Sequence, residues 1–350
     1  MEVKALKFGG LTAKRPIVQG GMGVGVSLSS LAGNVAKCGG VGTISGVHPG
    51  YREADFKENP FRANLRAIGN ELEKAKEIAN GGIIGFNFMT VMNHYEEYVK
   101  EAIAAGADFI VSGAGLPVNL AKYAAGTRAA ILPIVSSARA LKLIVKQWQR
   151  ADRMPDAVVV EGPLAGGHLG YPYGHLVDGT FDTLEDSLVD VVDYVRELEE
   201  KNGVKIPVIA GGGVRNHADM ERLMALGASG VQVGTKFVAT EECDAAPAFK
   251  QAYLRSRKKD VQLIESPVGL AARAIRNSFL EKVEKQGRIP VQRCYQCMNH
   301  CKQAETKYCI SQALIDAVQG REGLVFCGAN AYEIEKLSTV EKVMQELCGE

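Results

Sequence analysis

The stretch PVIAGGGVRNHADMERLMALGASGVQVGT, residues 207–235, contains a short apolar strand, a helix and a second apolar strand, and glycine follows each strand. The two strands, Pro207–Ala210 and Gly230–Val233, are apolar without alternation, which is typical of parallel strands buried on both faces. Between them, His217–Leu226 carries apolar residues at helical spacing, followed by a glycine at the position where helices commonly end. Such a strand–helix–strand unit indicates a parallel α/β fold.

The same unit recurs along most of the chain. The predicted strands are Pro16–Gln19, Val41–Ser45, Ile83–Phe88, Phe109–Ser112, Ile131–Val135, Ala157–Val160, Pro207–Ala210 and Gly230–Val233. The predicted helices are Leu28–Lys37, Arg62–Ala79, His94–Ala105, Val118–Ala125, Ala138–Gln149, Leu184–Lys201 and His217–Leu226. Eight strands that alternate with helices predict a closed (β/α)8 barrel, the TIM barrel, rather than a Rossmann sheet, which typically has about six strands.

The repeat leaves part of the 350 residues unexplained. We predict a barrel domain over residues 1–285 and a C-terminal, cysteine-rich, mainly helical extension over residues 286–350 that packs on the barrel. Two connections are long, Gly46–Phe61 after the second strand and Gly162–Thr183 after the sixth. Long loops at the carboxyl ends of barrel strands usually build the active site, so we expect it there.

The bulk composition excludes several kinds of partner. A net charge of +1 gives no electrostatic reason to expect a nucleic acid or an anionic membrane. No apolar run approaches the ~20 residues of a membrane-spanning helix. Met1–Gly10 lacks the apolar segment of a secretory signal. We therefore expect a cytoplasmic protein that acts on a small molecule. The sequence leaves open whether the chain forms a homo-oligomer.

Glycine-rich turns follow the seventh and eighth strands. The first contains Gly213 within Ala210-Gly-Gly-Gly-Val214, and the second is Gln232-Val233-Gly234-Thr235. In barrels these two loops commonly form a phosphate site, because glycine lets backbone N–H groups approach the phosphate oxygens. The Thr235 hydroxyl could add a donor. The alternative is that these glycines only form tight turns.

Two other strand ends suit a flat ring. Gln19-Gly20-Gly21-Met22-Gly23 ends the first strand, where glycine permits a ring to lie against the backbone and Met22 offers a polarizable side chain. Asn87 ends the third strand and could hydrogen-bond a planar ring. The alternatives are a plain glycine turn and a loop cap.

The loop after the sixth strand reads Glu161-Gly-Pro-Leu-Ala-Gly166-Gly-His168. Imidazole can act as an acid or a base near neutral pH, so His168 on an active-face loop is the best candidate for catalysis. Glu161 is expected to point into the barrel mouth. The alternatives are a bystander histidine and a solvated carboxylate. His48 and His175 also lie on the long loops and are weaker candidates.

Taken together, these motifs resemble the nitronate monooxygenases, formerly called 2-nitropropane dioxygenases, and their relatives, the flavin-dependent enoyl-acyl-carrier-protein reductases. The segments that carry the resemblance are Pro16–Gly23, Gly85–Asn87, Ser112–Pro117, Glu161–Gly170, Ala210–Val214 and Val231–Cys243. The resemblance implies non-covalently bound FMN, with His168 as the active-site histidine. The implied FMN contacts are Gly21, Met22, Gly23, Asn87, Glu161, Gly166, Gly213, Gln232, Val233, Gly234 and Thr235.

The resemblance leaves the reaction open. The family loop often reads Glu-Ala-Gly-Gly-His, but Leu164 replaces the glutamate here. Position 161 is often glutamine in the monooxygenases and glutamate in the reductases, and here it is Glu161. The leading hypothesis is oxidation of alkyl nitronates by O2, with His168 acting as a base on a carbon acid. The alternatives are NAD(P)H-dependent reduction of an enoyl thioester or another activated alkene and, in a different class, a phosphate-binding barrel without redox chemistry.

The C-terminal extension carries a cysteine pattern of its own. Cys294, Cys297, Cys301 and Cys309 are spaced C-x2-C-x3-C-x7-C. Thiolates this close can hold Zn²⁺ or an iron–sulfur cluster, and His300 is a further possible ligand. The spacing is neither a regular zinc-ribbon pair nor the standard ferredoxin run. The alternative is a set of buried thiols that pack a small helical appendage.

Overall fold

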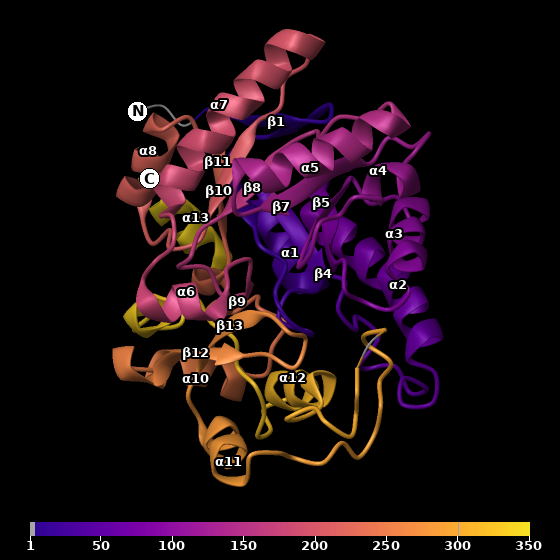
Figure 1. Ribbon diagram of the computed structural model, residues 1–350, viewed down its shortest axis with the longest axis vertical. Helices are drawn as coiled ribbons and strands as arrows, with labels where there is room; N and C mark the ends of the chain where they lie inside the picture. Colours follow the sequence, from indigo (N-terminus) through magenta and orange to yellow (C-terminus); the bar gives the residue numbers. More distant parts are fainter. Residues whose placement is uncertain (1–3, 300) are drawn as a thin grey trace.

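A computed structural model describes residues 4–299 and 301–350. Its centre is a closed barrel of parallel strands whose hydrogen-bonded order is β10-β11-β3-β4-β5-β6-β7-β8 (Figure 1). These strands are β3 (Ile17–Gln19), β4 (Val41–Ser45), β5 (Ile83–Met89), β6 (Phe109–Gly113), β7 (Ala130–Val135), β8 (Val158–Glu161), β10 (Val208–Gly211) and β11 (Gly230–Val233). The predicted (β/α)8 barrel is confirmed, and each predicted strand agrees with the observed one to within 1 residue at either end.

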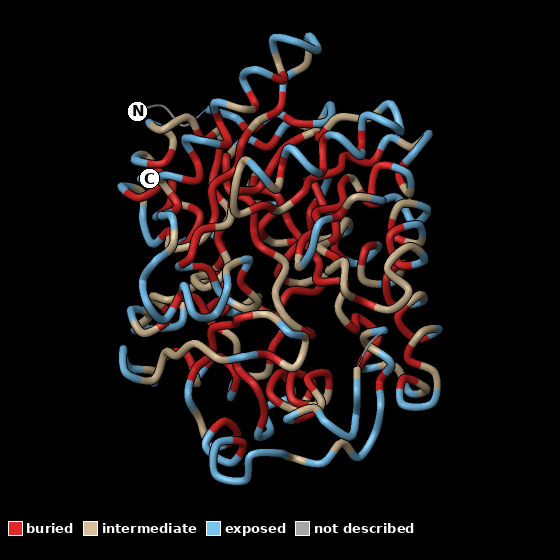
Figure 2. The backbone as a smooth tube through the Cα atoms, viewed as in Figure 1, coloured by how far each residue is buried: buried red, intermediate tan, exposed pale blue. Residues whose placement is uncertain are grey.

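Helices surround the barrel. Those that follow barrel strands are α1 (Ser29–Lys37), α2 (Pro60–Ala79), α3 (Tyr95–Ala104), α4 (Leu120–Tyr123), α5 (Ala138–Trp148), α7 (Leu184–Asn202) and α8 (His217–Ala225). Their ends follow capping rules: at α8 the Asn216 side chain accepts a hydrogen bond from the Asp219 N–H, at 3.0 Å. The apolar faces of these helices pack on the strands, so the buried residues are concentrated in the barrel wall (Figure 2).

A short hairpin lies at the amino ends of the barrel strands. It pairs β1 (Leu6–Phe8) with β2 (Leu11–Ala13), and Leu6 and Phe8 are both buried in a cluster with barrel-strand residues. The Phe8 ring meets Phe109 of β6 edge-on, with centroids 6.0 Å apart. The hairpin, which the sequence analysis did not predict, therefore covers one end of the barrel and leaves the carboxyl ends of the strands for the site.

A second small sheet lies at those carboxyl ends. Its order is β12 (Val261–Glu265), β13 (Ala271–Ile275) and β9 (Gly167–Leu169), all antiparallel, so the loop after β8 pairs with a segment 100 residues later. In this pairing His168 lies opposite Ala272. The remaining helical segments before the extension are η1 (Gln149–Ala151), α6 (Tyr173–Asp178), α9 (Thr235–Val238), α10 (Pro247–Arg255), η2 (Lys258–Asp260) and α11 (Ser278–Gln286).

The C-terminal extension contains short helices and irregular stretches, with no helix and no strand over the described residues 287–299 and 301–309. Its helices are α12 (Ile310–Val318), η3 (Ala331–Glu333) and α13 (Val340–Cys348), and α13 contacts α1, α8 and α9 on the barrel. Figure 1 shows α13 beside α8. Among the described residues, no helix has the length and apolar character needed to cross a membrane.

Candidate active site

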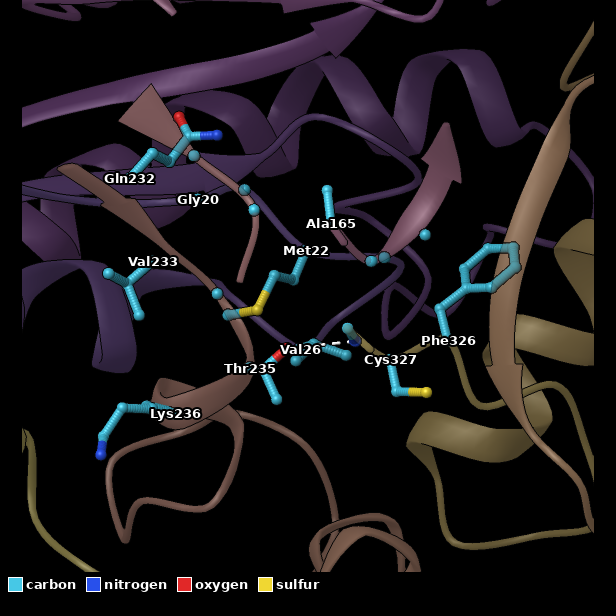
Figure 3. A pocket seen from close by; sticks show the side chains of 18 of the residues that line it. Gly20, Met22, Val26, Ala165, Gln232, Val233, Thr235, Lys236, Phe326 and Cys327 are labelled. Carbon is cyan, nitrogen blue, oxygen red and sulfur yellow. Dashed lines mark hydrogen bonds between the residues drawn. The ribbon is translucent and has the colours of Figure 1, made fainter. Parts of the chain in front are cut away.

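A cavity of about 460 Å³ opens at the carboxyl ends of the barrel strands. Such a volume is typical of cofactor and small-molecule sites. Every predicted FMN contact lines it, and so does His168; Figure 3 shows several of these residues around the opening. The structure thus brings together residues that five different strands and loops supply.

The turns after β10 and β11 form the glycine-rich end of the cavity. Gly212 and Gly213 have φ angles of 104° and 91°, a left-handed region that strongly favours glycine. A Cβ atom on Gly213 would lie 3.2 Å from the Cβ of Leu164, in space that the cavity needs. The Thr235 hydroxyl oxygen accepts a hydrogen bond from the Gly328 N–H at 3.1 Å, which leaves the Thr235 O–H able to donate. These groups fit a phosphate.

The turn after β3 forms a flat part of the wall. A Cβ on Gly21 would lie 2.4 Å from the Cβ of Asn87. Only glycine, which has no Cβ, therefore lets the backbone come this close to the Asn87 side chain. Gln232 lies beside Gly20, and its buried Oε1 has no hydrogen-bond partner among the described residues. A buried polar atom without a partner indicates a group that a ligand satisfies. The residues present therefore fit a flavin: glycine backbone for the phosphate and ring, and an unpaired amide oxygen beside the ring.

Glu161 ends β8 and faces the cavity. Burial raises its pKa to about 7, although the Gly170 N–H and the nearby Arg273 both act in the opposite direction. The carboxyl group therefore titrates close to neutral pH, which is typical of functional sites. Its backbone carbonyl also accepts a hydrogen bond from the Tyr171 hydroxyl at 3.0 Å, which ties the β8 end to the loop that carries His168.

His168 lies in β9, and its Nε2 is 2.8 Å from the Ser266 hydroxyl oxygen. The Phe326 ring packs edge-on against the imidazole, with centroids 5.0 Å apart. Burial lowers the pKa of His168 to about 4, so the ring is neutral at pH 7. Within the described part of the chain, Nδ1 has no hydrogen-bond partner, which leaves one nitrogen for a substrate.

Several residues in or around the cavity were missed by the sequence analysis. Ser266, just after β12, and Arg273, in β13, do not line the cavity but contact residues that do. Ser266 is hydrogen-bonded to His168, and Arg273 donates to the Ala165 carbonyl while 8% exposed. The segment Phe326–Asn330 of the extension lines the cavity opposite β3. A Cβ on Gly166 would lie 2.7 Å from the Gly328 nitrogen, so this segment packs directly on the loop that follows β8. Arg273, a charge inside the apolar run Ala271–Ile275, was the one usable signal in the sequence.

The other sequence candidates lie elsewhere. His48 is buried, with Nε2 2.8 Å from the Ser311 hydroxyl and Nδ1 3.3 Å from the Asn64 amide. It therefore ties the β4 loop to the extension. His175 is exposed on α6, away from the cavity lining. The four predicted metal ligands of the extension do not line this cavity but a second, smaller one, and His300 lies outside the described residues.

The fold and this site define a class of protein, an α/β barrel with a cofactor-sized cavity at the carboxyl ends of its strands. Comparison with known families is more specific: residues 4–350 match the family described as nitronate monooxygenase. The chain belongs to the nitronate monooxygenase family, and it is an oxidoreductase of that flavin-using type, as predicted.

Individual relatives agree with this assignment. A probable nitronate monooxygenase of Staphylococcus saprophyticus is 25% identical over 308 residues, which cover 81% of this chain and 82% of the relative. A probable nitronate monooxygenase of Staphylococcus aureus is 26% identical over 305 residues, with coverage of 80% and 81%.

Among solved structures, FabK from Thermotoga maritima superposes with a TM-score of 0.71 at 24% identity, over 96% of this chain and 92% of that one. A nitroalkane oxidase from Streptomyces ansochromogenes gives a TM-score of 0.66 at 21% identity, over 96% and 95% of the two chains. At these identities the superpositions establish a shared fold.

Proposed function

We propose that this chain binds FMN in the large cavity and oxidises alkyl nitronates with O2. The observation that carries the proposal is the meeting, in one cavity, of the glycine-rich turns after β10 and β11 with a neutral histidine on the opposite wall. The phosphate would contact Gly213, Gly234 and Thr235, and the ring would lie along Gly21–Gly23 beside Asn87 and Gln232. Bound there, FMN supplies the electron-transfer chemistry between substrate and O2.

The chain's own residues prepare the substrate. A base must be unprotonated before it can act, and burial keeps His168 neutral at pH 7. Because Ser266 engages Nε2, the ring is held in one orientation and Nδ1 is left without a hydrogen-bond partner among the described residues. His168 would then take the α-proton of a neutral nitroalkane, the carbon acid, and the resulting nitronate is the species that is oxidised. Ser266 and Phe326 are positioning residues in this scheme, since they act on the imidazole rather than on the substrate.

One observation favours a second candidate. Position 161 is glutamate, the residue that the reductases often have there, and the Glu161 carboxyl group titrates near pH 7. The alternative function is NAD(P)H-dependent reduction of an enoyl thioester or another activated alkene. In that reaction His168 would orient or protonate the substrate instead of accepting a proton.

Anaerobic mixing of the purified yellow protein with either reductant tests the proposal. An alkyl nitronate should bleach the flavin absorption rapidly, and NADH or NADPH should do so slowly or not at all. Rapid bleaching by a nicotinamide with no response to nitronate would replace the proposal with the reductase function. A protein without flavin, even after reconstitution with FMN, would contradict both and leave the non-redox phosphate barrel.

A further inference from the structure

The second cavity lies in the extension and is lined by all four cysteines of the C-x2-C-x3-C-x7-C pattern, Cys294, Cys297, Cys301 and Cys309. It is small, about 20 Å³. A cavity of that size holds about one water-sized atom. The spacing along the chain did not by itself require these side chains to meet. Their convergence on one space is an observation about the fold, independent of the pattern.

A backbone N–H group already points at one of the sulfurs. The Gln296 N–H donates to the Cys294 sulfur at 3.3 Å, and Gln296 adopts a left-handed φ of 51° at this turn. A positive φ in a non-glycine residue is costly, so the turn persists because something else stabilises it. Cys309 is the residue before α12, and its side chain makes no capping hydrogen bond.

The backbone around the cavity has no regular secondary structure. Between α11 and α12 the described residues 287–299 and 301–309 form no helix and no strand. Its contacts with the barrel include hydrogen bonds from the Asn93 amide to the Gln296 carbonyl at 2.7 Å and from the Asn93 N–H to the Cys297 carbonyl at 3.1 Å, and the stacking of Tyr295 on Phe56. Irregular segments this long are uncommon inside compact domains, and metal ligation is one way to order them.

We propose that Cys294, Cys297, Cys301 and Cys309 bind a thiophilic metal centre, either a single Zn²⁺ ion or an iron–sulfur cluster, through four thiolates. Binding a divalent ion displaces the four thiol protons and leaves two excess negative charges, which the Gln296 N–H at the Cys294 sulfur partly offsets. Among the described residues, no three histidine, cysteine or acidic side chains stand close enough to hold an ion as they are, so the thiols must turn toward the cavity centre on binding.

The centre would anchor the part of the extension that reaches the flavin cavity. Cys309 is the residue just before α12. Within that helix the Ser311 hydroxyl is hydrogen-bonded to His48, and Leu314 lines the large cavity. The chain then continues to Phe326–Asn330 on the same cavity wall. A metal bound at Cys309 would therefore hold the start of α12 in place, and with it the first part of the extension that lines the large cavity.

The test is metal analysis of the full-length protein after anaerobic purification. We expect either about one Zn per chain without acid-labile sulfide, or about four Fe with a matching amount of sulfide. Cys297→Ser and Cys301→Ser should each lower the metal content at least ~10-fold. Cys38→Ser is the matched control, because Cys38 is a half-buried cysteine outside the small cavity, and it should leave the content unchanged.

Thiol titration of the wild type keeps the test decisive if a variant fails to fold. With a metal bound, the four thiols should be protected in the native protein and should titrate after unfolding with a chelator. Less than about 0.2 equivalents of Zn or Fe per chain, after reconstitution with either metal, would overturn the proposal, as would equal metal content in Cys297→Ser and Cys38→Ser.

Discussion

The large cavity has two walls of different construction. The barrel wall is mostly backbone, formed by the turns at Gly20–Gly23, Gly211–Gly213 and Gly234. The other wall is built of side chains from β9 and the extension, among them His168 and Phe326. Backbone N–H groups suit a phosphate and a flat ring, whereas an imidazole held by neighbours suits proton transfer. The difference indicates that one wall binds the cofactor and the other acts on the substrate, so variants should separate cofactor affinity from turnover.

The largest effect is expected on the side-chain wall. His168→Ala should reduce turnover of a neutral nitroalkane, which must lose a proton before oxidation, by roughly 10²–10⁴-fold, the usual cost of losing a general base, while the dissociation constant for FMN stays the same. Steady-state kinetics and FMN titration measure the two quantities. His175→Ala, an exposed histidine on α6, is the control and should change neither. Turnover within a factor of about three of the wild type would make His168 a bystander.

A smaller effect of the opposite kind is expected on the backbone wall. Gly213→Val places a branched side chain at a φ of 91° and against Leu164, so FMN affinity should fall by about 10²-fold. Gly179→Val is matched for strain, at a φ of 68° with no atom within 4 Å of its Cβ. It should destabilise the fold to a similar degree and leave FMN binding intact. Equal FMN affinity in the two variants would mean that the phosphate lies elsewhere.

Thr235 lies where the two walls meet, because its hydroxyl also accepts the Gly328 N–H. Thr235→Val removes a donor worth about 1–3 kcal/mol when it pairs with a charged group, so FMN affinity should fall by roughly 10-fold. Thr235→Ser keeps the hydroxyl and should bind FMN as the wild type does. Isothermal titration of the flavin-free proteins measures the difference. The same loss in both variants would assign the effect to the missing methyl group and its packing.

The two walls also differ in how far the sequence could predict them. Strand ends such as Gly213 and Gly234 are local signals, because a barrel brings all its strand ends to one rim whatever the details of packing. All the predicted strands and the cavity position of His168 followed from that rule. Ser266, Arg273 and Phe326 could not be found in this way. Phe326 reaches the cavity, and Ser266 and Arg273 reach residues that line it, through the pairing of β9 with β13 and through the docking of the extension. Both depend on contacts between segments far apart in the chain.

The smallest expected effect is a pair of opposite pH dependences in thermal unfolding, one for each wall. On the barrel wall, burial raises the Glu161 pKa to about 7, above the ~4.3 of an unfolded chain. The folded state therefore binds a proton preferentially, and the Glu161 contribution to stability grows as pH falls from about 7 towards 4.3. On the other wall, burial lowers the His168 pKa to about 4, below its ~6.5 when unfolded. Here the unfolded state binds the proton preferentially, so stability is lost as pH falls from about 6.5 to 4.

Substitutions at Glu161 and His168 separate their two contributions to the pH dependence of stability. Relative to Glu161→Gln, the Tm of the flavin-free wild type should rise as pH is lowered through that window, by an amount on the order of a few degrees. Relative to His168→Asn, it should fall over nearly the same range. Differential scanning calorimetry between pH 4.5 and 7.5 measures both differences, and each variant serves as the other's control because the remaining titratable groups are shared. Parallel slopes for the two variants would show that burial does not set these pKa values in opposite directions, and the assignment of His168 as the neutral group at pH 7 would then lose its basis.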